Sequence, residues 1–291
     1  MRCDFIRQQK KVFPITSLCR VLGVSRSGYY KFEKLHREEK KMREMSLINK
    51  VRAIQKKANG SYGARRISRE LRKQGYNIGR HQAGSLMKKA GAEFRARKKF
   101  KRTTDSRHKH PVAENILNRQ FEVENPDKVW CADITYLWTM QGWLYLAVVL
   151  DLFSRKVVGW AMSNRINAQL VVDALRMAYW RRKPPPGLLH HSDRGSQYAA
   201  KAYQKELEKY KMVCSMSRKG NCWDNAPAES FFRSLKTERT DDMLYATRDE
   251  AKSDAVDYIE MFYNSHRLHS SLGYESPNQY EARRKLLAKV A

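Results

Sequence analysis

The hydrophobic pattern of this chain changes its period near residue 125, and that change restricts the fold more than any other feature. Before this point apolar residues recur at helical spacing, as Ile67 and Leu71 do. Residues 129–138 instead alternate, and residues 143–150 form an unbroken apolar run. Alternation is typical of a strand with one buried face, and a short apolar run suits a central strand. A helical first part therefore precedes a part that contains a sheet.

The second part predicts a definite order of elements. Strands are expected at 129–138, 143–150, 156–162, 188–191 and 212–216, and helices near 167–181, 201–210 and 226–238. The order β-β-β-α-β-α-β-α is that of a ribonuclease-H-like domain. We therefore expect an α/β fold with a mixed five-stranded sheet, preceded by an all-helical region.

Charge divides the chain at a similar place. Residues 1–110 hold 32 Lys and Arg against 8 Asp and Glu, whereas residues 111–291 hold 26 against 22. Such an excess repels itself unless a polyanion neutralises it, and nucleic acid is the expected polyanion. Ribosomal or membrane-surface binding could use the same charge. The asymmetry indicates a basic binding part joined to a nearly neutral part.

Two helical hairpins are expected in the basic part. Residues 14–32 read as a helix, a turn at Gly23 and a second short helix capped by Ser25, which would present Arg26 and Tyr29 to DNA. A charged helix near 35–57 follows. Residues 62–91 repeat the hairpin, and their polar faces carry Arg65, Arg66, Arg69 and Arg80. A solvated basic face is the alternative to DNA docking for both hairpins.

These patterns divide the chain into four regions. We predict a helix-turn-helix region at 1–57, a second such domain at 58–93, a basic linker at 94–124 and a catalytic core with C-terminal helices at 125–291. No stretch approaches the roughly 20 apolar residues that span a bilayer. The N-terminus has no long apolar run of the secretory type. We therefore expect a cytoplasmic protein without a membrane partner, whose five scattered cysteines are reduced thiols rather than disulfides or zinc ligands.

Three carboxylates stand out in the second part. Asp133 lies in mid-strand on the face opposite Trp130, Asp193 follows the strand 188–191, and Glu229 lies in the first turn of a helix. Each has a structural alternative, namely a salt bridge, a turn cap or a helix-dipole contact. In the expected fold the two strands are neighbours and the helix crosses them. The three carboxylates would then converge and, unless an arginine such as Arg194 turns inward, bind a hard cation, Mg²⁺ or Mn²⁺.

Five motifs carry a specific resemblance. They are WCADITYL (130–137), VVLDLFSRKVVGW (148–160), HHSDRGSQY (190–198), GNCWDNAPAESFFRSLKTE (220–238) and YNSHRLHSSLGYESPNQY (263–280). In these motifs, and in YGARRISREL and the hairpin before it, the chain resembles the OrfB transposase subunit of bacterial insertion sequences. That family belongs to the retroviral-integrase superfamily with an Asp-Asp-Glu triad. The 35 residues between Asp193 and Glu229 are the spacing for which this family is known.

The resemblance implies a function and its parts. It implies that Asp133, Asp193 and Glu229 hold two divalent ions, and that the chain cleaves and joins DNA during insertion-sequence transposition. It also implies a basic residue seven positions after the glutamate, here Lys236, which would share a helix face with Arg233 and touch phosphate. A solvated lysine is the alternative. The implied partners are double-stranded element ends and target DNA on the nucleoid, further copies of the chain, and the upstream-frame OrfA protein or its fusion.

Other polar residues near the motifs leave alternatives open. Asp151 recurs in the family pattern outside the triad, so a structural role is expected. His190 and His191 either orient Asp193 or serve the structure. The loop with Asn221, Asp224 and Asn225 either shapes a pocket for a DNA end or makes turns and caps. Ser192 and Cys222 lack a base for nucleophilic catalysis in sequence. A metal nuclease or a DNA-binding regulator would use parts of the same pattern.

Overall fold

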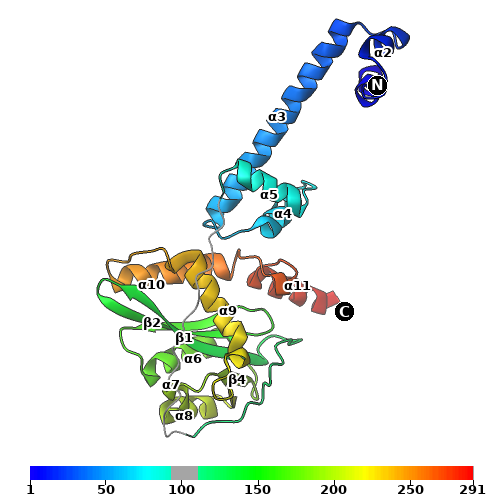
Figure 1. Ribbon diagram of the computed structural model, residues 1–291. Coiled ribbons are helices and arrows are strands. Elements are labelled where there is room, and N and C mark those ends of the chain that lie inside the picture. Colours follow the sequence, from blue (N-terminus) through cyan, green and yellow to red (C-terminus); the bar gives the residue numbers. More distant parts are fainter. Residues whose placement is uncertain (93–110, 291) are drawn as a thin grey trace. The chain divides into compact units, whose positions relative to one another are not determined.

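The computed structural model describes residues 1–92 and 111–290 (Figure 1). Two compact units result, one from residues 1–57 and 62–92, the other from residues 58–61 and 111–290. The basic segment 94–110 lies outside the described residues. Among the described helices, none has the length and apolar character needed to cross a membrane. The domain boundaries drawn from the sequence stay predictions.

The first unit begins with the expected helical hairpin. Helices α1 (Arg2–Gln9) and α2 (Ile15–Val21) pack against the start of α3 (Arg26–Lys57) around Ile6, Leu18, Cys19 and Tyr29. Gly23 makes the turn with a φ of +61°. The Ser25 hydroxyl accepts a hydrogen bond from the Gly28 N–H at 3.1 Å, which confirms the predicted cap.

Helix α3 differs from the prediction, because one helix of 32 residues replaces a short helix and a separate charged helix. The sequence has no proline between residues 26 and 57, and its only glycine, Gly28, lies in the first turn. The Lys, Glu, Arg, Met and Leu residues that fill the span have high helix propensity. Nothing in the local sequence therefore ends the helix before Lys57.

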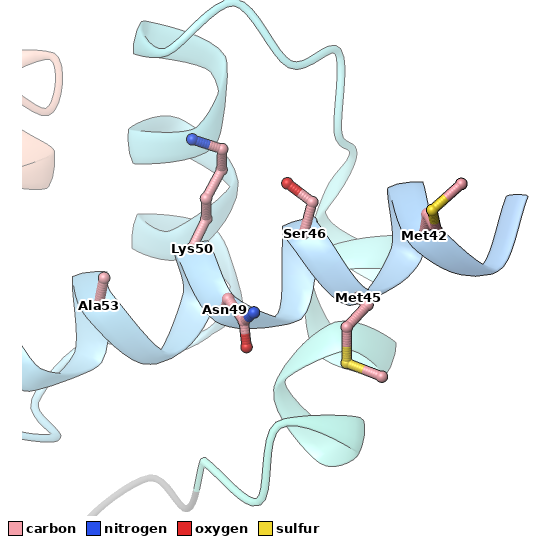
Figure 2. Close-up of a pocket in the computed structure, with 6 residues that line it drawn as sticks. All are labelled: Met42, Met45, Ser46, Asn49, Lys50 and Ala53. Carbon is pink, nitrogen blue, oxygen red and sulfur yellow. The ribbon is translucent and has the colours of Figure 1, made fainter. Parts of the chain in front are cut away.

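The second hairpin packs on the C-terminal half of α3. Helices α4 (Ala64–Lys73) and α5 (Arg80–Lys89) are joined through Gly75, whose φ is +86°. An open hollow runs along α3, lined by Met42, Met45, Ser46, Asn49, Lys50 and Ala53 (Figure 2). This face of α3 carries exposed methionines and holds none of the carboxylates that the sequence singles out.

The second unit contains the predicted mixed sheet of five strands. Its strand order is β3-β2-β1-β4-β5. Strands β1 (Val129–Thr139), β2 (Gly142–Asp151) and β3 (Val157–Ser163) form an antiparallel meander, while β4 (Leu189–Ser192) and β5 (Val213–Met216) run parallel to β1. Each strand begins and ends within one residue of its predicted position. The α/β, ribonuclease-H-like fold expected from the sequence is confirmed.

Helices cover both faces of this sheet (Figure 1). On one face lie α6 (Ala168–Arg182), α7 (Ser196–Ala199) and α8 (Lys201–Lys209), whose side chains join a core with Trp130 and Ala132. On the other face, α9 (Ala226–Leu235) and η3 (Asp257–Tyr263) join a core with Cys131 and Val148. The chain is completed by η1 (Cys222–Asn225), η2 (Lys236–Thr240), α10 (Arg248–Val256), η4 (Ser270–Leu272) and α11 (Pro277–Val290).

The helix predicted at 226–238 ends earlier than expected, at Leu235. The next five residues, Lys236–Thr240, form a π-helical turn instead. Such turns insert an extra residue into a helix and are frequent at functional sites. A buried ion pair fixes this turn, because the Arg267 guanidinium donates to both Glu238 carboxylate oxygens at 2.7–3.0 Å.

Close packing of α6 on the sheet depends on Gly159. A Cβ at this position would overlap the carbonyl oxygen of Ala174 and lie 2.6 Å from the backbone nitrogen of Ala178. Both atoms belong to the helix backbone, which cannot rotate away as a flexible side chain could. The glycine therefore sets the distance between helix and sheet.

We expect Gly159→Ala to lower the free energy of unfolding by about 1–3 kcal/mol, because α6 must shift away from the sheet. Urea denaturation followed by circular dichroism measures the change. Gly84→Ala is the control, since its Cβ would meet only the Ala64 side chain at 3.8 Å and would favour the helix. Equal stability of the Gly159→Ala variant and the parent chain would contradict the packing argument.

Candidate active site

Asp133 occupies the middle of β1, on the sheet face that α9 covers. Its neighbours Cys131 and Thr135 share that face, while Trp130 and Ala132 point to the α6 side. The carboxylate accepts the Ile134 N–H at 2.8 Å. Burial, followed by the charges of Asp193 and Glu229, raises the pKa of Asp133 well above its usual range, and Lys236 opposes this. Because the charges of Asp193 and Glu229 both act on Asp133, this carboxyl group lies at the centre of the site.

Asp193 is placed by the parallel pairing of β4 with β1. Ala132 pairs with Ser192 on the neighbouring strand. Asp133 and Asp193 are the residues that come directly after this pair. The Asp193 carboxylate accepts the Gly195 N–H at 2.9 Å, which orients it at the end of the strand. The next residue, Arg194, donates from Nε to the Ser217 carbonyl at 2.5 Å.

Glu229 comes from the first turn of α9. Asn225, just before this helix, donates from its side-chain amide to the Ala132 carbonyl at 3.1 Å and so ties the start of α9 to β1. Through this contact the helix delivers Glu229 close enough to raise the pKa of Asp133. The structure therefore brings together all three carboxylates that the sequence singled out.

The three carboxylates are gathered but not closed around a common centre. Within residues 1–92 and 111–290, no three His, Cys, Asp or Glu side chains are already arranged as ligands of one metal ion. The donor set nevertheless fits a hard divalent cation, since it consists of carboxylates whose mutual repulsion a cation would relieve. Asp133, Asp193 and Glu229 are the residues that could hold such an ion.

Lys236 stands beside the carboxylates at the start of η2. Its ammonium group lies 4.8 Å from the centre of the Tyr136 ring and is close enough to lower the pKa of Asp133. Burial in turn lowers the pKa of Lys236 itself. Arg233, one turn earlier, is exposed. The site therefore combines three carboxylates with a half-buried lysine.

Comparison with known proteins places the chain in a family. Integrase core domain models match residues 123–222 and 229–284, and an HTH-like domain model matches residues 42–100. The chain is 41% identical over 283 residues to the transposase InsF for insertion sequence IS3A of Escherichia coli strain K12, covering 97% of this chain and 98% of that protein. The chain belongs to the InsF-type transposases of insertion sequences. The family resemblance seen in the motifs is thereby confirmed, as are transposase function and the assignment to the polynucleotidyl transferases with an integrase core.

The chain is also similar to other proteins. An uncharacterized 31 kDa protein of insertion element IS600 from Shigella sonnei is 43% identical over 260 residues, covering 89% of this chain and 96% of that protein. Among solved structures, a simian T-cell lymphotropic virus intasome chain aligns with a TM-score of 0.46 at 16% identity, over 75% of this chain and 70% of that one. The catalytic core domain of BIV integrase aligns with a TM-score of 0.42 at 18% identity, over 56% and 99%.

Asp224 anchors the loop that leads into α9 of the transposase. It is fully buried and accepts hydrogen bonds from Arg119 at 2.8 Å and from the Arg218 guanidinium at 2.8 and 2.9 Å. Asn115 donates to it as well, at 2.9 Å. These partners hold the pKa of Asp224 well below its usual range. Asn221 caps η1 by accepting a hydrogen bond from the Trp223 N–H. These contacts favour the structural interpretation of this loop, in which its polar residues make turns and caps.

Asp151 and the two histidines also have structural contacts. Asp151 is buried, accepts from Ser154 and from the Asp127 N–H, and has its pKa raised to about 7, mainly by burial. The His191 ring bonds Ser215 and Ser217, and His190 Nε2 bonds the Tyr203 hydroxyl. The hydrogen-bond partners of these rings thus come from β5, from the residue after β5 and from α8, rather than from Asp193.

The side chains expected to face DNA in the helical unit are mostly exposed. Those on the surface are Arg26, Arg65, Arg69 and Arg80, while Arg66 is half-buried over the Tyr62 ring. Tyr29 is different, since it is 1% exposed and its hydroxyl donates to Glu33 at 3.0 Å. It belongs to the core of the first hairpin, so we leave it out of the proposed DNA contacts. The sequence placed Tyr29 and its exposed neighbour Tyr30 on the same helix, and helix spacing alone did not show which of the two faces solvent.

Asp224→Asn tests the anchor of the α9 loop. We expect the free energy of unfolding at pH 7 to fall by about 2–4 kcal/mol, because two arginines lose their buried partner. Since the folded state lowers the pKa of Asp224, its stabilisation is present above the unfolded value of about 3.9 and is lost as pH falls below it.

The stability difference between Asp224→Asn and the parent chain should therefore shrink between about pH 5 and pH 2. Thermal unfolding at a series of pH values measures it. Asp249→Asn, at an exposed carboxylate in the same unit, is the control and should change little. A pH-independent difference would show that the charge of Asp224 is not what stabilises the loop.

Proposed function

We propose that Asp133, Asp193 and Glu229 are the catalytic triad of this transposase and bind two divalent ions, Mg²⁺ or Mn²⁺. The observation that carries this proposal is the meeting of three chain segments at one place: β4 ends beside Ala132, so Asp193 follows next to Asp133, and Asn225 ties the start of α9, with Glu229 in its first turn, to the same residue of β1. Bound ions would activate the attacking oxygen and stabilise the leaving oxygen of a phosphodiester.

The protein's own groups supply position and charge. Asn225 keeps the start of α9 on β1, so Glu229 stays in place when DNA enters. Lys236, half-buried beside Asp133, is suited to bind a phosphate oxygen next to the scissile bond, and exposed Arg233 extends this contact. In cleavage, water attacks phosphorus and the 3′ oxygen leaves as a hydroxyl. In joining, that 3′-OH attacks a target phosphodiester and displaces another 3′ oxygen.

The same proposal assigns DNA contacts to the helical unit. Exposed Arg26, Arg65, Arg69 and Arg80, with half-buried Arg66, would bind phosphates of double-stranded element ends and target DNA. Two ends must be held together for joining, so we propose that the transposase acts as an oligomer on DNA. The upstream-frame OrfA protein, or a fusion with it, is the proposed partner for recognition of the ends.

Glu229→Gln tests the triad. On a labelled duplex carrying the terminal repeat that flanks the reading frame, with Mg²⁺ present, we expect strand cleavage and joining to fall roughly 10³-fold or more. Gln keeps the size of the side chain and removes its charge. Asp173→Asn, an exposed carboxylate of α6, is the matched control and should retain activity. Undiminished Mg²⁺-dependent cleavage by Glu229→Gln would remove Glu229 from the triad.

Arg69→Gln tests the helical unit. We expect weaker binding of duplexes of any sequence, with the slope of log K against log salt reduced by about 1, because one phosphate contact is lost. The measurement is fluorescence anisotropy over a salt series. Arg176→Gln makes the same charge change in the catalytic unit, where Arg176 pairs with Glu206. Equal slopes for the two variants would mean that Arg69 does not contact phosphate.

A further inference from the structure

An exposed aromatic group closes the outer end of the β1–β2 hairpin. Trp138 pairs with Trp143 and Tyr136 with Tyr145, so these side chains share one sheet face. Trp143 packs edge-on against both Trp138 and Tyr136, with ring centres 4.7 and 4.9 Å apart. Trp138 and Trp143 are nevertheless 53% and 42% exposed. We refer to Tyr136, Trp138 and Trp143 as the aromatic platform.

The platform is held rigidly although it is open to solvent. Gly142 makes the hairpin turn with a φ of +97°, and the Thr139 hydroxyl donates to its carbonyl at 2.7 Å. Arg248 from α10 donates to the Trp143 carbonyl at 3.1 Å and to the Gln141 carbonyl. Fixing two tryptophans in an exposed position leaves a large apolar surface in water. Such surfaces on a stable fold are typical of binding sites.

The platform is linked to the carboxylate site through strand β1 and through Lys236. Tyr136 is three residues after Asp133 on the same strand, and alternation puts the two side chains on opposite faces. The Lys236 ammonium lies 4.8 Å from the centre of the Tyr136 ring, and Lys236 directly follows α9, the helix that carries Glu229. Among the described residues, β4 pairs with β1 only from Val129 to Ala132, which leaves this edge without a neighbouring strand at Asp133.

The chemistry of the platform fits one ligand class. Flat π surfaces bind nucleobases by stacking, and the adjacent ammonium of Lys236 suits the phosphate that each base carries. Bases inside a duplex are already stacked on each other, so only unpaired bases offer free faces. We propose that the platform stacks unpaired bases of the DNA strand whose phosphodiester lies at the triad. This inference rests on the proposed function, since it takes DNA to be bound at the carboxylates.

A stacking probe tests the proposal directly. The whole chain in EDTA is mixed with a duplex that has a three-nucleotide single-stranded extension containing 2-aminopurine, whose fluorescence falls when it stacks. We expect quenching at saturation by the parent chain and its loss in Trp138→Ala and Trp143→Ala. The preference for the extended over the blunt duplex should fall roughly 5-fold or more, since stacking on one aromatic ring contributes at least this much.

Three further variants separate stacking from folding. Trp138→Phe keeps an aromatic face and should retain most of the quenching, whereas Trp138→Leu keeps apolar bulk and should lose it. Trp180→Ala removes another exposed tryptophan, on α6, and should leave quenching unchanged. Unchanged quenching in both Trp138→Ala and Trp143→Ala would overturn the proposal. Unchanged quenching together with a smaller oligomer would also overturn it and would identify the platform as a protein interface.

The outcome is distinguishable from that of the triad test. Glu229→Gln should quench 2-aminopurine as the parent chain does, because the platform does not include this residue, while its cleavage of the terminal-repeat duplex is lost. Normal cleavage by the parent chain without quenching would leave the triad standing and overturn the platform. Quenching that requires Trp138, together with normal cleavage by Glu229→Gln, would support the platform and overturn the triad.

Discussion

The limited pairing of β1 with β4 is the constraint on which the site depends. Strand β4 accompanies β1 only to Ala132 and then ends at Ser192, so Asp133 and Asp193 follow side by side where the paired ladder stops. Helix α9 lies on the sheet face that carries Asp133, and the Asn225–Ala132 hydrogen bond fixes where the helix starts relative to β1. The end of the β1–β4 ladder therefore places Asp193 beside Asp133, and the start of α9 brings Glu229 to the same two strands.

Gathering three carboxylates in one place is unfavourable, and the rest of the catalytic unit offsets this cost with buried ion pairs around the cluster. Asp224 is held by Arg119 and Arg218 before α9, and Glu238 is held by Arg267 after it. The Tyr258 hydroxyl donates to Glu238 at 2.8 Å, so this second pair is further satisfied. Helix α9 is thus fixed at both ends. Repulsion between Glu229 and the two aspartates cannot push the helix away, and a bound cation can relieve it instead.

The sequence predicted the features of the fold that depend on the local pattern of apolar and polar residues. Alternation located β1 and put Asp133 on the face opposite Trp130, and the order of strands and helices predicted the sheet. Features that depend on distant residues were not predictable in this way. One partner of Asp224 is Arg119, which is 105 residues away, and the 53% exposure of Trp138 depends on packing that strand alternation does not reveal. Tyr29 and Tyr30 are neighbours with opposite environments, which a hairpin pattern without its packing partners could not distinguish.

Most of the excess positive charge lies in the first 110 residues, whereas the three carboxylates and the aromatic platform lie in the second unit. This division explains what the platform would add to DNA binding. The basic part can hold DNA through phosphates, but that attraction is screened by salt and is the same along the backbone. The catalytic unit is nearly neutral, so it needs another interaction to select which phosphodiester lies at the triad. Stacking of an unpaired base on Trp138 and Trp143 depends little on salt and acts only where the duplex is open. Beside Lys236 it would fix the register of the strand relative to Asp133, a selection that the phosphate contacts alone cannot make.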